Sequence, residues 1–205
     1  MNNCIIINGQ KIELAPGQVE KAVAALSIER VKLSEIMPGN TFKIGDYEFV
    51  VLDQTGDTAM VILRDLLPDT VRFGENNNYL DSNVDEMCNE FAQELASEIG
   101  LENIVLHEVD LTSDDGLKDY GVIHRRVSSI TAEMYRKFVE TLDKFKPDAW
   151  WWLATPHSTA THENDSWVKC VSPSGYIGHY HYDCYVLGYG VRPFCILKSN
   201  IFVSK

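Results

Sequence analysis

The sequence predicts an α+β fold with short antiparallel strands and two main helices. Short β-branched and aromatic segments are separated by Gly-containing turns, and two longer segments carry apolar residues at helical spacing. These helical segments lie between groups of strands and do not alternate with them one by one, which is typical of the α+β class. With 205 residues, of which 45% are hydrophobic and 23% charged, the chain is long enough for one well-buried domain.

Residues 1–30 are expected to form a small appendage to this domain. Ile5 to Leu14 predicts a hairpin, because Asn8-Gly9 supplies the positive φ angles of a type I′ turn. Pro16-Gly17 then begins a short helix that continues to about Ile28. The main domain covers residues 31–205.

The first strands of the main domain predict an antiparallel meander. Gly45-Asp46 and Thr55-Gly56-Asp57 are turn sequences between segments of strand character. The strands expected on either side of these turns are Thr41 to Ile44, Tyr47 to Leu52 and Thr58 to Leu63.

Two helices follow the meander. Ser82 can cap a helix that runs to Ile99 and stops at Gly100. Its apolar positions have the spacing of a core-facing side: Val84, Met87, Cys88, Phe91, Leu95 and Ile99. Thr131 can cap a second helix that ends near Lys144, Lys146 and Pro147. The apolar positions of the second helix are Tyr135, Phe138, Val139 and Leu142.

The C-terminal third predicts more strands. Three adjacent tryptophans, Trp150 to Trp152, alternate between the two faces of an extended segment. This segment is therefore expected to enter a core from both sides, or to meet a core on one side and a partner on the other. Arg192 precedes a proline among apolar residues, which indicates a guanidinium fixed in one geometry. Trp151 and Arg192 are therefore expected to be scaffold residues. The further strands expected here lie near Trp167 to Val171, Tyr176 to Tyr182 and Val191 to Leu197.

The two motifs also support a resemblance. Residues 151–156 and 190–193 read W-W-L-x-[ST]-P and G-V-R-P, and this pair resembles an uncharacterised bacterial and phage domain family that is similar to C-type-lectin-like and formylglycine-generating-enzyme-type folds. The resemblance implies a C-type-lectin-like α+β domain whose ligand face includes the region shortly before the last strand. The paired reactive cysteines of formylglycine-generating enzymes have no match in this chain.

The first candidate binding surface is acidic. Residues 75–119 contain thirteen acidic residues and one base, Lys118, so this segment accounts for the whole net charge of −12. Within it, Glu86, Glu90, Glu94 and Glu98 recur every fourth residue and form one column on the first helix. Like charges at this spacing repel each other and do not stabilise the helix. The column, which we call the acidic ridge, predicts docking on a basic protein surface; a solvated face is the alternative.

The second candidate is a Tyr- and His-rich segment, residues 176–189, which holds five of the nine tyrosines. Tyrosine gives a large contact area at low entropy cost, so the segment predicts a carbohydrate or small-ligand surface. A half-buried strand with tyrosines at its rim is the alternative. The aromatic candidates are Trp167, Tyr176, Tyr180, Tyr182, Tyr185 and Tyr189.

Four histidines form a candidate zinc site. In an extended strand His179 and His181 project from the same face, and His157 and His162 in the preceding loop could complete the coordination. The set lacks C-x-x-C or H-E-x-x-H spacing, so ordinary surface or hydrogen-bonded histidines are the alternative, and no cofactor is expected otherwise.

These observations together predict a non-catalytic protein-binding module. No phosphate loop, G-x-S-x-G elbow or Rossmann fingerprint occurs, although a Cys-His pair stays an alternative. The chain shows no signal peptide and no apolar run of roughly 18 residues, and its five dispersed cysteines fit a reducing compartment, so a cytoplasmic location is expected. The acidic charge disfavours nucleic acid and membranes as direct partners. One concrete form of the prediction is a phage or mobile-element inhibitor that occupies the basic groove of a host defence protein such as a CRISPR effector.

Overall fold

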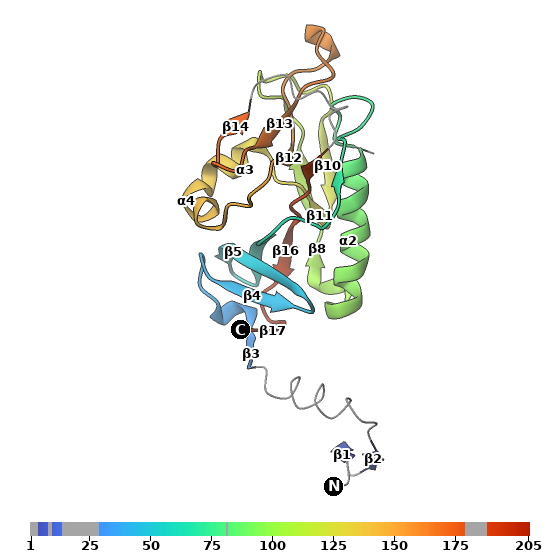
Figure 1. Ribbon diagram of the computed structural model, residues 1–205, viewed down its shortest axis with the longest axis vertical. Helices are drawn as coiled ribbons and strands as arrows, with labels where there is room; N and C mark the ends of the chain where they lie inside the picture. The colour runs from blue at the N-terminus through green and yellow to red at the C-terminus, as the bar shows by residue number, and fades with distance from the viewer. Residues whose placement is uncertain (1–3, 8–9, 14–28, 81, 179–187) are drawn as a thin grey trace.

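The strands in the described part of the chain form two larger sheets and two hairpin-like pairs (Figure 1). The computed structural model describes residues 4–7, 10–13, 29–80, 82–178 and 188–205. Within these residues, β12 (Trp151–Pro156) pairs in parallel with β15 (Tyr189–Gly190), and the other strand pairs are antiparallel. The predicted class, a mixture of helices with mostly antiparallel strands, is confirmed. The helix expected up to Ile28 lies outside the described residues.

The N-terminal hairpin consists of β1 (Cys4–Ile7) and β2 (Gln10–Glu13), in which Ile7 lies opposite Gln10. This pairing confirms the hairpin, while the Asn8-Gly9 turn itself lies outside the described residues. The chain then enters the larger sheet at β3 (Arg30–Lys32), which pairs with β17 (Phe202–Ser204). The expected start of a main domain at residue 31 stays a prediction.

The eight-stranded sheet is built around the meander that the sequence predicts. Its central strands are β4 (Thr41–Ile44), β5 (Tyr47–Thr55) and β6 (Thr58–Leu63). Gly45 and Gly56 in the two turns have φ of +56°, which favours glycine. Strand β16 (Phe194–Lys198) pairs with β6, with β8 (Ile104–Val105) and with β11 (Val127–Ser128). These pairings are long-range in sequence, and the sequence did not predict β3, β8, β11 or β17.

The five-stranded sheet has the order β14-β13-β12-β15-β7. Its remaining strands are β7 (Thr70–Val71), β13 (Val168–Val171) and β14 (Ile177–Gly178). A separate pair consists of β9 (His107–Asp110) and β10 (Val122–Arg125). Short 3-10 helices connect the elements: η1 (Leu33–Glu35), η2 (Leu101–Asn103), η3 (Asp143–Phe145) and η4 (Ala160–His162).

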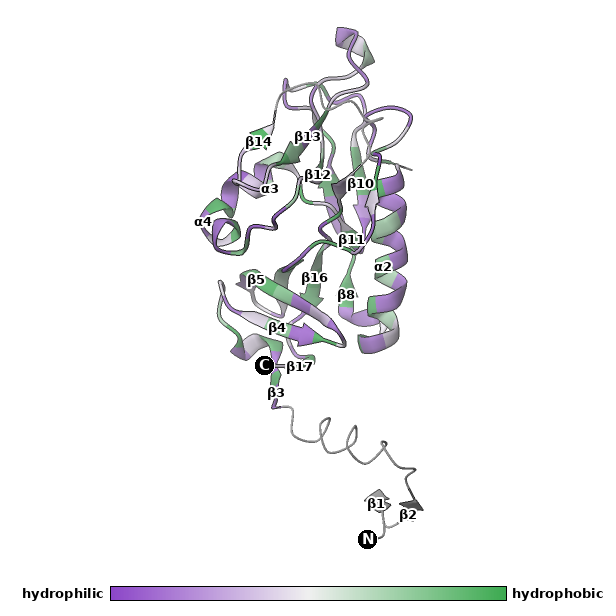
Figure 2. Ribbon diagram, viewed as in Figure 1, coloured by the Kyte–Doolittle hydropathy of each residue, from purple (hydrophilic) through white to green (hydrophobic). Residues whose placement is uncertain are grey.

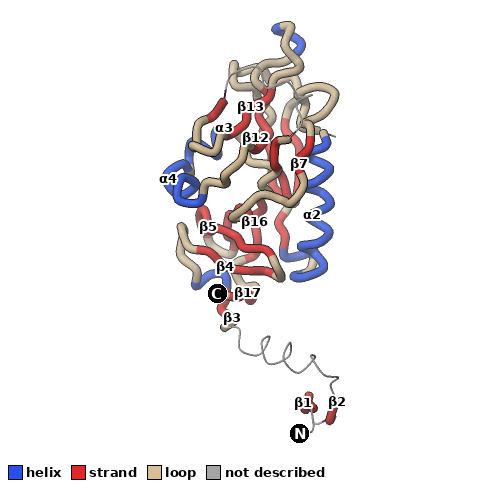
Figure 3. Tube along the Cα trace, viewed as in Figure 1, coloured by secondary structure: helices blue, strands red, loops and turns tan. Residues whose placement is uncertain are grey.

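The helices lie on opposite sides of the strands (Figures 1 and 3). Helix α2 (Asn83–Ile99) begins after its cap Ser82 and ends at Gly100, as predicted. The second predicted helix is capped by Thr131 as expected but is not continuous. It ends as α3 (Ala132–Lys137), since Phe138 leaves helical geometry at φ −109° and ψ 16°, and then continues as α4 (Val139–Leu142) and η3. This break keeps Tyr135 and Leu142 buried in the same apolar cluster.

Two apolar clusters form the core, and the tryptophans of β12 enter both. Trp152 packs in the cluster that covers the apolar side of α2, whereas Trp151 packs in the cluster beneath α3 and α4. Both side chains are at most 1% exposed, and the apolar strands that carry these clusters are seen in Figure 2. The prediction that this segment meets a core on both faces is confirmed.

The Gly-Val-Arg-Pro motif is the segment in which the chain passes from the smaller sheet to the larger one. Gly190 ends β15 in the smaller sheet and pairs with Trp151, while Phe194 begins β16 in the larger sheet. Arg192 between them is 1% exposed. It donates hydrogen bonds to the carbonyl oxygens of Leu63, Arg64 and Phe145, each at 2.8 Å, and its guanidinium lies 5.4 Å from the centre of the Trp151 ring. Arg192 and Trp151 are therefore scaffold residues, as the sequence predicts.

Candidate functional site: the acidic ridge and a cationic pocket

Helix α2 forms where the sequence places it because its ends and its apolar side are both specified locally. The Ser82 side chain accepts a hydrogen bond from the Asp85 amide, and Gly100 adopts φ of +83° just beyond the last turn. Val84, Cys88 and Phe91 bury the inner side, where the Phe91 ring meets Tyr47 edge-on at 4.8 Å. The four carboxylates of the acidic ridge consequently lie on the outer side of the helix.

All four residues of the acidic ridge are exposed. Over the described part of the chain, no Lys, Arg or His nitrogen lies within 4.0 Å of their carboxylate oxygens. Glu94 accepts a hydrogen bond of 2.7 Å from the Tyr47 hydroxyl, and this bond raises the pKa of Tyr47 above its ordinary value. The ridge is thus about 18 Å long at 1.5 Å per residue and has no neighbouring cation to balance it among the residues described.

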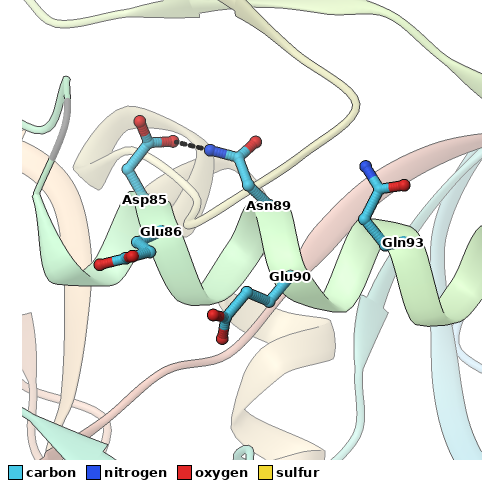
Figure 4. A pocket seen from close by; sticks show the side chains of 5 residues that line it. All are labelled: Asp85, Glu86, Asn89, Glu90 and Gln93. Atoms are coloured by element: carbon cyan, nitrogen blue, oxygen red, sulfur yellow. Dashed lines mark hydrogen bonds between the residues drawn. The ribbon is translucent and has the colours of Figure 1, made fainter.

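A second row of polar side chains runs beside the ridge (Figure 4). Asp85, Asn89 and Gln93 project from one side of α2, and Glu86 and Glu90 from another; together the five line a shallow depression. Asp85 is not part of the acidic surface. It is 1% exposed and accepts two hydrogen bonds from Arg125 of β10, at 2.8 and 2.7 Å. This ion pair attaches α2 to β10.

Some of the remaining acidic residues of segment 75–119 have hydrogen-bond partners within the fold. Burial alone would raise the pKa of Asp115, but hydrogen bonds from Ser113, Ser158 and His162 outweigh it and hold that pKa well below its usual range. Asp119 accepts hydrogen bonds from Thr159 and Thr161, which lower its pKa. Both carboxylates are exposed, and through these hydrogen bonds they join two loops.

Those two loops are residues 110–121 and 157–167. Asn77 is hydrogen-bonded to the second loop. Its side-chain amide donates to the carbonyl oxygens of Ser158 and Trp167, at 2.9 and 3.0 Å. Its own carbonyl accepts from the Tyr120 hydroxyl at 2.7 Å. The loop that the sequence places before the aromatic segment is therefore fixed by hydrogen bonds.

The described aromatic candidates differ in exposure and in ring contacts. Tyr189 is half-buried and stacks on Trp150 with ring centres 5.7 Å apart. Trp167 is half-buried and lies 5.6 Å from the His157 ring. Tyr176 is 45% exposed. Tyr180, Tyr182 and Tyr185 lie outside the described residues.

The four candidate zinc ligands also include residues in different surroundings and residues outside the described part of the chain. His162 binds Asp115 at 2.9 Å, whereas His157 packs against Trp167. His179 and His181 lie outside the described residues. Among the residues that the structure describes, no three His, Cys, Asp or Glu side chains are grouped as metal ligands would be. Cys88, Cys170 and Cys195 are free and buried, and burial raises the pKa of Cys88 and Cys170 to about 12.

A pocket between α3 and β13 brings together residues that the sequence did not single out. It has a volume of about 630 Å³ and contains Asp114, Arg136 and Lys169. Asp114 binds Lys169 at 2.7 Å and Arg136 at 2.8 Å. Burial would raise the pKa of Asp114, but the hydrogen bonds from Lys169 and Arg136 outweigh it and lower that pKa. The feature of the sequence that could have indicated this pocket is Lys169, a single charged residue between Val168 and Cys170 in a buried strand.

Comparison with models of known protein families, with curated proteins and with solved structures finds no match to this chain. The candidate sites are therefore interpreted from their own geometry. No helix in the described part of the chain is long and apolar enough to cross a membrane.

Proposed function

We propose that the chain is a non-catalytic protein-binding module whose acidic ridge docks on a basic protein surface. The observation that carries the proposal is the column of four exposed carboxylates, Glu86, Glu90, Glu94 and Glu98, without a cation beside it in the described residues. A basic partner would supply the missing positive charge. Such charge complementarity increases association rates and gives specificity.

The energetics of α2 support this proposal, because the repulsion along the ridge is unfavourable for the helix, although the helix dipole favours Glu86 in the first turn. Each pair of like charges four residues apart is unfavourable by about 0.2–0.5 kcal/mol. Glu94 and Glu98 also lie toward the C-terminal end of α2, where the helix dipole disfavours negative charge. A contribution to binding explains why carboxylates stand at these positions.

In its finer form, the proposal is that the protein is an inhibitor that occupies the nucleic-acid-binding groove of its partner. The inhibitor would act inside the cell that makes it and would have a C-type-lectin-like fold. Successive ridge carboxylates are about 6 Å apart along the helix, whereas DNA carries one charge per 3.4 Å of each strand. The ridge would therefore match part of the charge of a nucleic-acid strand. A host defence protein such as a CRISPR effector has a groove of the required sign.

The alternative, a carbohydrate or small-ligand surface made by the aromatic segment, has less support from the described residues. Tyr189 stacks on Trp150 and Trp167 lies against the His157 ring, so Tyr176 is the exposed aromatic side chain of the candidate set within the described part of the chain.

The test compares three forms of the full chain as bait in a lysate of the native host, with the retained proteins quantified by mass spectrometry. The ridge variant carries Glu86→Gln, Glu90→Gln, Glu94→Gln and Glu98→Gln. The matched control removes four exposed charges elsewhere, through Glu35→Gln, Asp57→Asn, Glu140→Gln and Asp148→Asn. We expect a basic protein that wild type and control retain, that the ridge variant loses, and that wild type releases when NaCl rises from about 0.05 to 0.5 M. Equal retention by the ridge variant would refute the proposal.

The inhibitor form has its own measurement, made with the purified partner. Fluorescence anisotropy of labelled DNA bound to that partner should fall when wild type is added and stay constant with the ridge variant. If DNA and wild type bind the partner together, the inhibitor form is wrong while docking by the ridge stands.

A further inference from the structure

The pocket between α3 and β13 has a charged floor and an apolar wall. Lys169 of β13 has a side chain that is 4% exposed, while Arg136 of α3 is 57% exposed at the rim. His157 and Gly175 complete the polar side. The wall opposite consists of Tyr135, Val139, Tyr176 and Ile177.

The floor carries an excess of positive charge. Lys169 and Arg136 share one carboxylate, that of Asp114; two cations and one anion leave a net charge of +1. An ammonium has three N–H donors and a guanidinium five, so Asp114 cannot satisfy both groups. Asp143, which lies near Gly175, is itself paired with Lys146 at 3.8 Å. The pocket is therefore locally cationic in a chain of net charge −12.

The burial of Lys169 strengthens this observation. Removing an ammonium from water is unfavourable unless it is paired and hydrogen-bonded, and its single ion pair among the described residues is with a carboxylate that also binds Arg136. An anion in the pocket would give the buried Lys169 ammonium a further acceptor, and it would give Arg136 a second charged partner besides Asp114.

The apolar wall restricts the rest of the ligand. The Tyr135 hydroxyl donates to the Gly175 carbonyl at 2.8 Å, which fixes this ring in place. Gly175 has φ of +85°, and a side chain there would meet Asp143 and the Tyr135 hydroxyl, so glycine lets the turn approach α3. Val139, Ile177 and the exposed Tyr176 ring then offer contact to a compact apolar group.

We infer that this pocket binds a small organic anion, a carboxylate or phosphate carried on a compact apolar or aromatic body, with Lys169 and Arg136 holding the anionic group. Its volume of about 630 Å³ lies in the range of small-ligand sites. The net charge of the chain disfavours polyanions. The pocket lies apart from the residues of the acidic ridge, so this site does not depend on the proposed function.

The experiment titrates the full chain with phenyl phosphate, with benzoate and with neutral benzyl alcohol, followed by amide chemical shifts. We expect saturable shifts at Tyr176 and Ile177 with at least one of the two anions, and weaker binding of benzyl alcohol. Whichever of the two anions binds with the higher affinity shows whether the pocket prefers a phosphate or a carboxylate. No saturable binding of either anion up to about 10 mM, or equal affinity for benzyl alcohol, would overturn the inference.

Variants locate the anionic group. Arg136→Gln should weaken binding about tenfold or more, because charged hydrogen bonds to the anion are lost. Lys137→Gln is the matched control: it removes the same charge from the next position of α3, outside the pocket, and should bind like wild type. Lys169→Met should weaken binding further. Because Arg136 is exposed at the rim, its variant stays informative even if Lys169→Met fails to fold. Wild-type affinity in Arg136→Gln would contradict the assignment.

Discussion

The His107 imidazole is held inside the fold and illustrates how single residues couple this protein to pH. Its Nε2 lies 3.1 Å from the Ser128 hydroxyl and its ring meets Phe194 edge-on at 5.2 Å. Burial lowers the pKa of His107 from 6.5 to about 4. The histidine is therefore neutral in the folded protein at pH 7, where it serves the packing.

His107 should make the folded protein sensitive to mild acid. A group whose folded pKa is lowered contributes stability that is present above its unfolded pKa and is lost as pH falls toward the folded value. Between pH 7 and 4.5 the free energy of unfolding should fall by about 2 kcal/mol, measured by urea denaturation. In His107→Gln most of this decrease should disappear, whereas His124→Gln, at an exposed position, should keep it. An equal decrease in His107→Gln would show that another group titrates.

The types of residue in the sequence did not predict which charged side chains pair with each other. Asp85 with Arg125 and Asp114 with Lys169 are ion pairs between distant segments, and the sequence counted both aspartates as part of an exposed acidic field. Both pairs depend on how long-range packing places α2, β10 and β13, which buries Asp85 and leaves Asp114 exposed.

At the scale of elements, the predictions from the sequence were most accurate where caps, turns and apolar spacing within a few residues define the element. Ser82, Gly100 and the apolar spacing between them define α2, and the turns at Gly45 and Gly56 define the β4-β5-β6 meander. The second helix was correct at its Thr131 cap and wrong in its continuity. Its apolar spacing continues across Phe138, so the break was not visible as a change of pattern.

The acidic ridge gives a prediction about α2 itself. The ridge variant, in which all four ridge glutamates are replaced by glutamine, should be more stable than wild type by about 1 kcal/mol, because three repulsive i,i+4 pairs are removed. Urea denaturation at low salt measures the difference, which should shrink as NaCl screens the charges. The amide oxygen introduced by Glu94→Gln can still accept the hydrogen bond that the Tyr47 hydroxyl donates to Glu94 in wild type. A ridge variant less stable than wild type would show that the carboxylates serve the fold.

At the scale of the whole molecule, the two sheets are joined by the motifs that also carry the family resemblance. The chain passes from β15 to β16 through Val191 and Pro193, whose carbonyls accept hydrogen bonds from Leu67 and Leu63. Arg192 spans the crossing and binds carbonyls at the end of β6 and in η3. The two motifs lie side by side in the structure, since Trp151 pairs with Gly190 and its ring lies 5.4 Å from the Arg192 guanidinium.

Loss of Arg192 should therefore destabilise the whole domain. Burial lowers its pKa to about 10, so it stays charged at pH 7, and Arg192→Met leaves three carbonyl oxygens without this donor. We expect the free energy of unfolding to fall by at least about 3 kcal/mol. The control Arg64→Met, at a half-exposed ion pair, should change it by less than about 1 kcal/mol. Similar small effects in both would mean that the crossing does not depend on Arg192.

The sequence by itself determined the α+β class, helix α2, the meander, the buried tryptophans and the scaffold role of Arg192, because caps, turns and periodicity act over a few residues. Only the tertiary structure decided which charges stay exposed. Among the residues it describes, it left the acidic ridge without a cation nearby, buried Asp85 against Arg125, and placed Lys169 and Arg136 on one carboxylate. The physical reason is that the state of a charge depends on neighbours brought from distant strands, and pairing between strands is not encoded in local spacing.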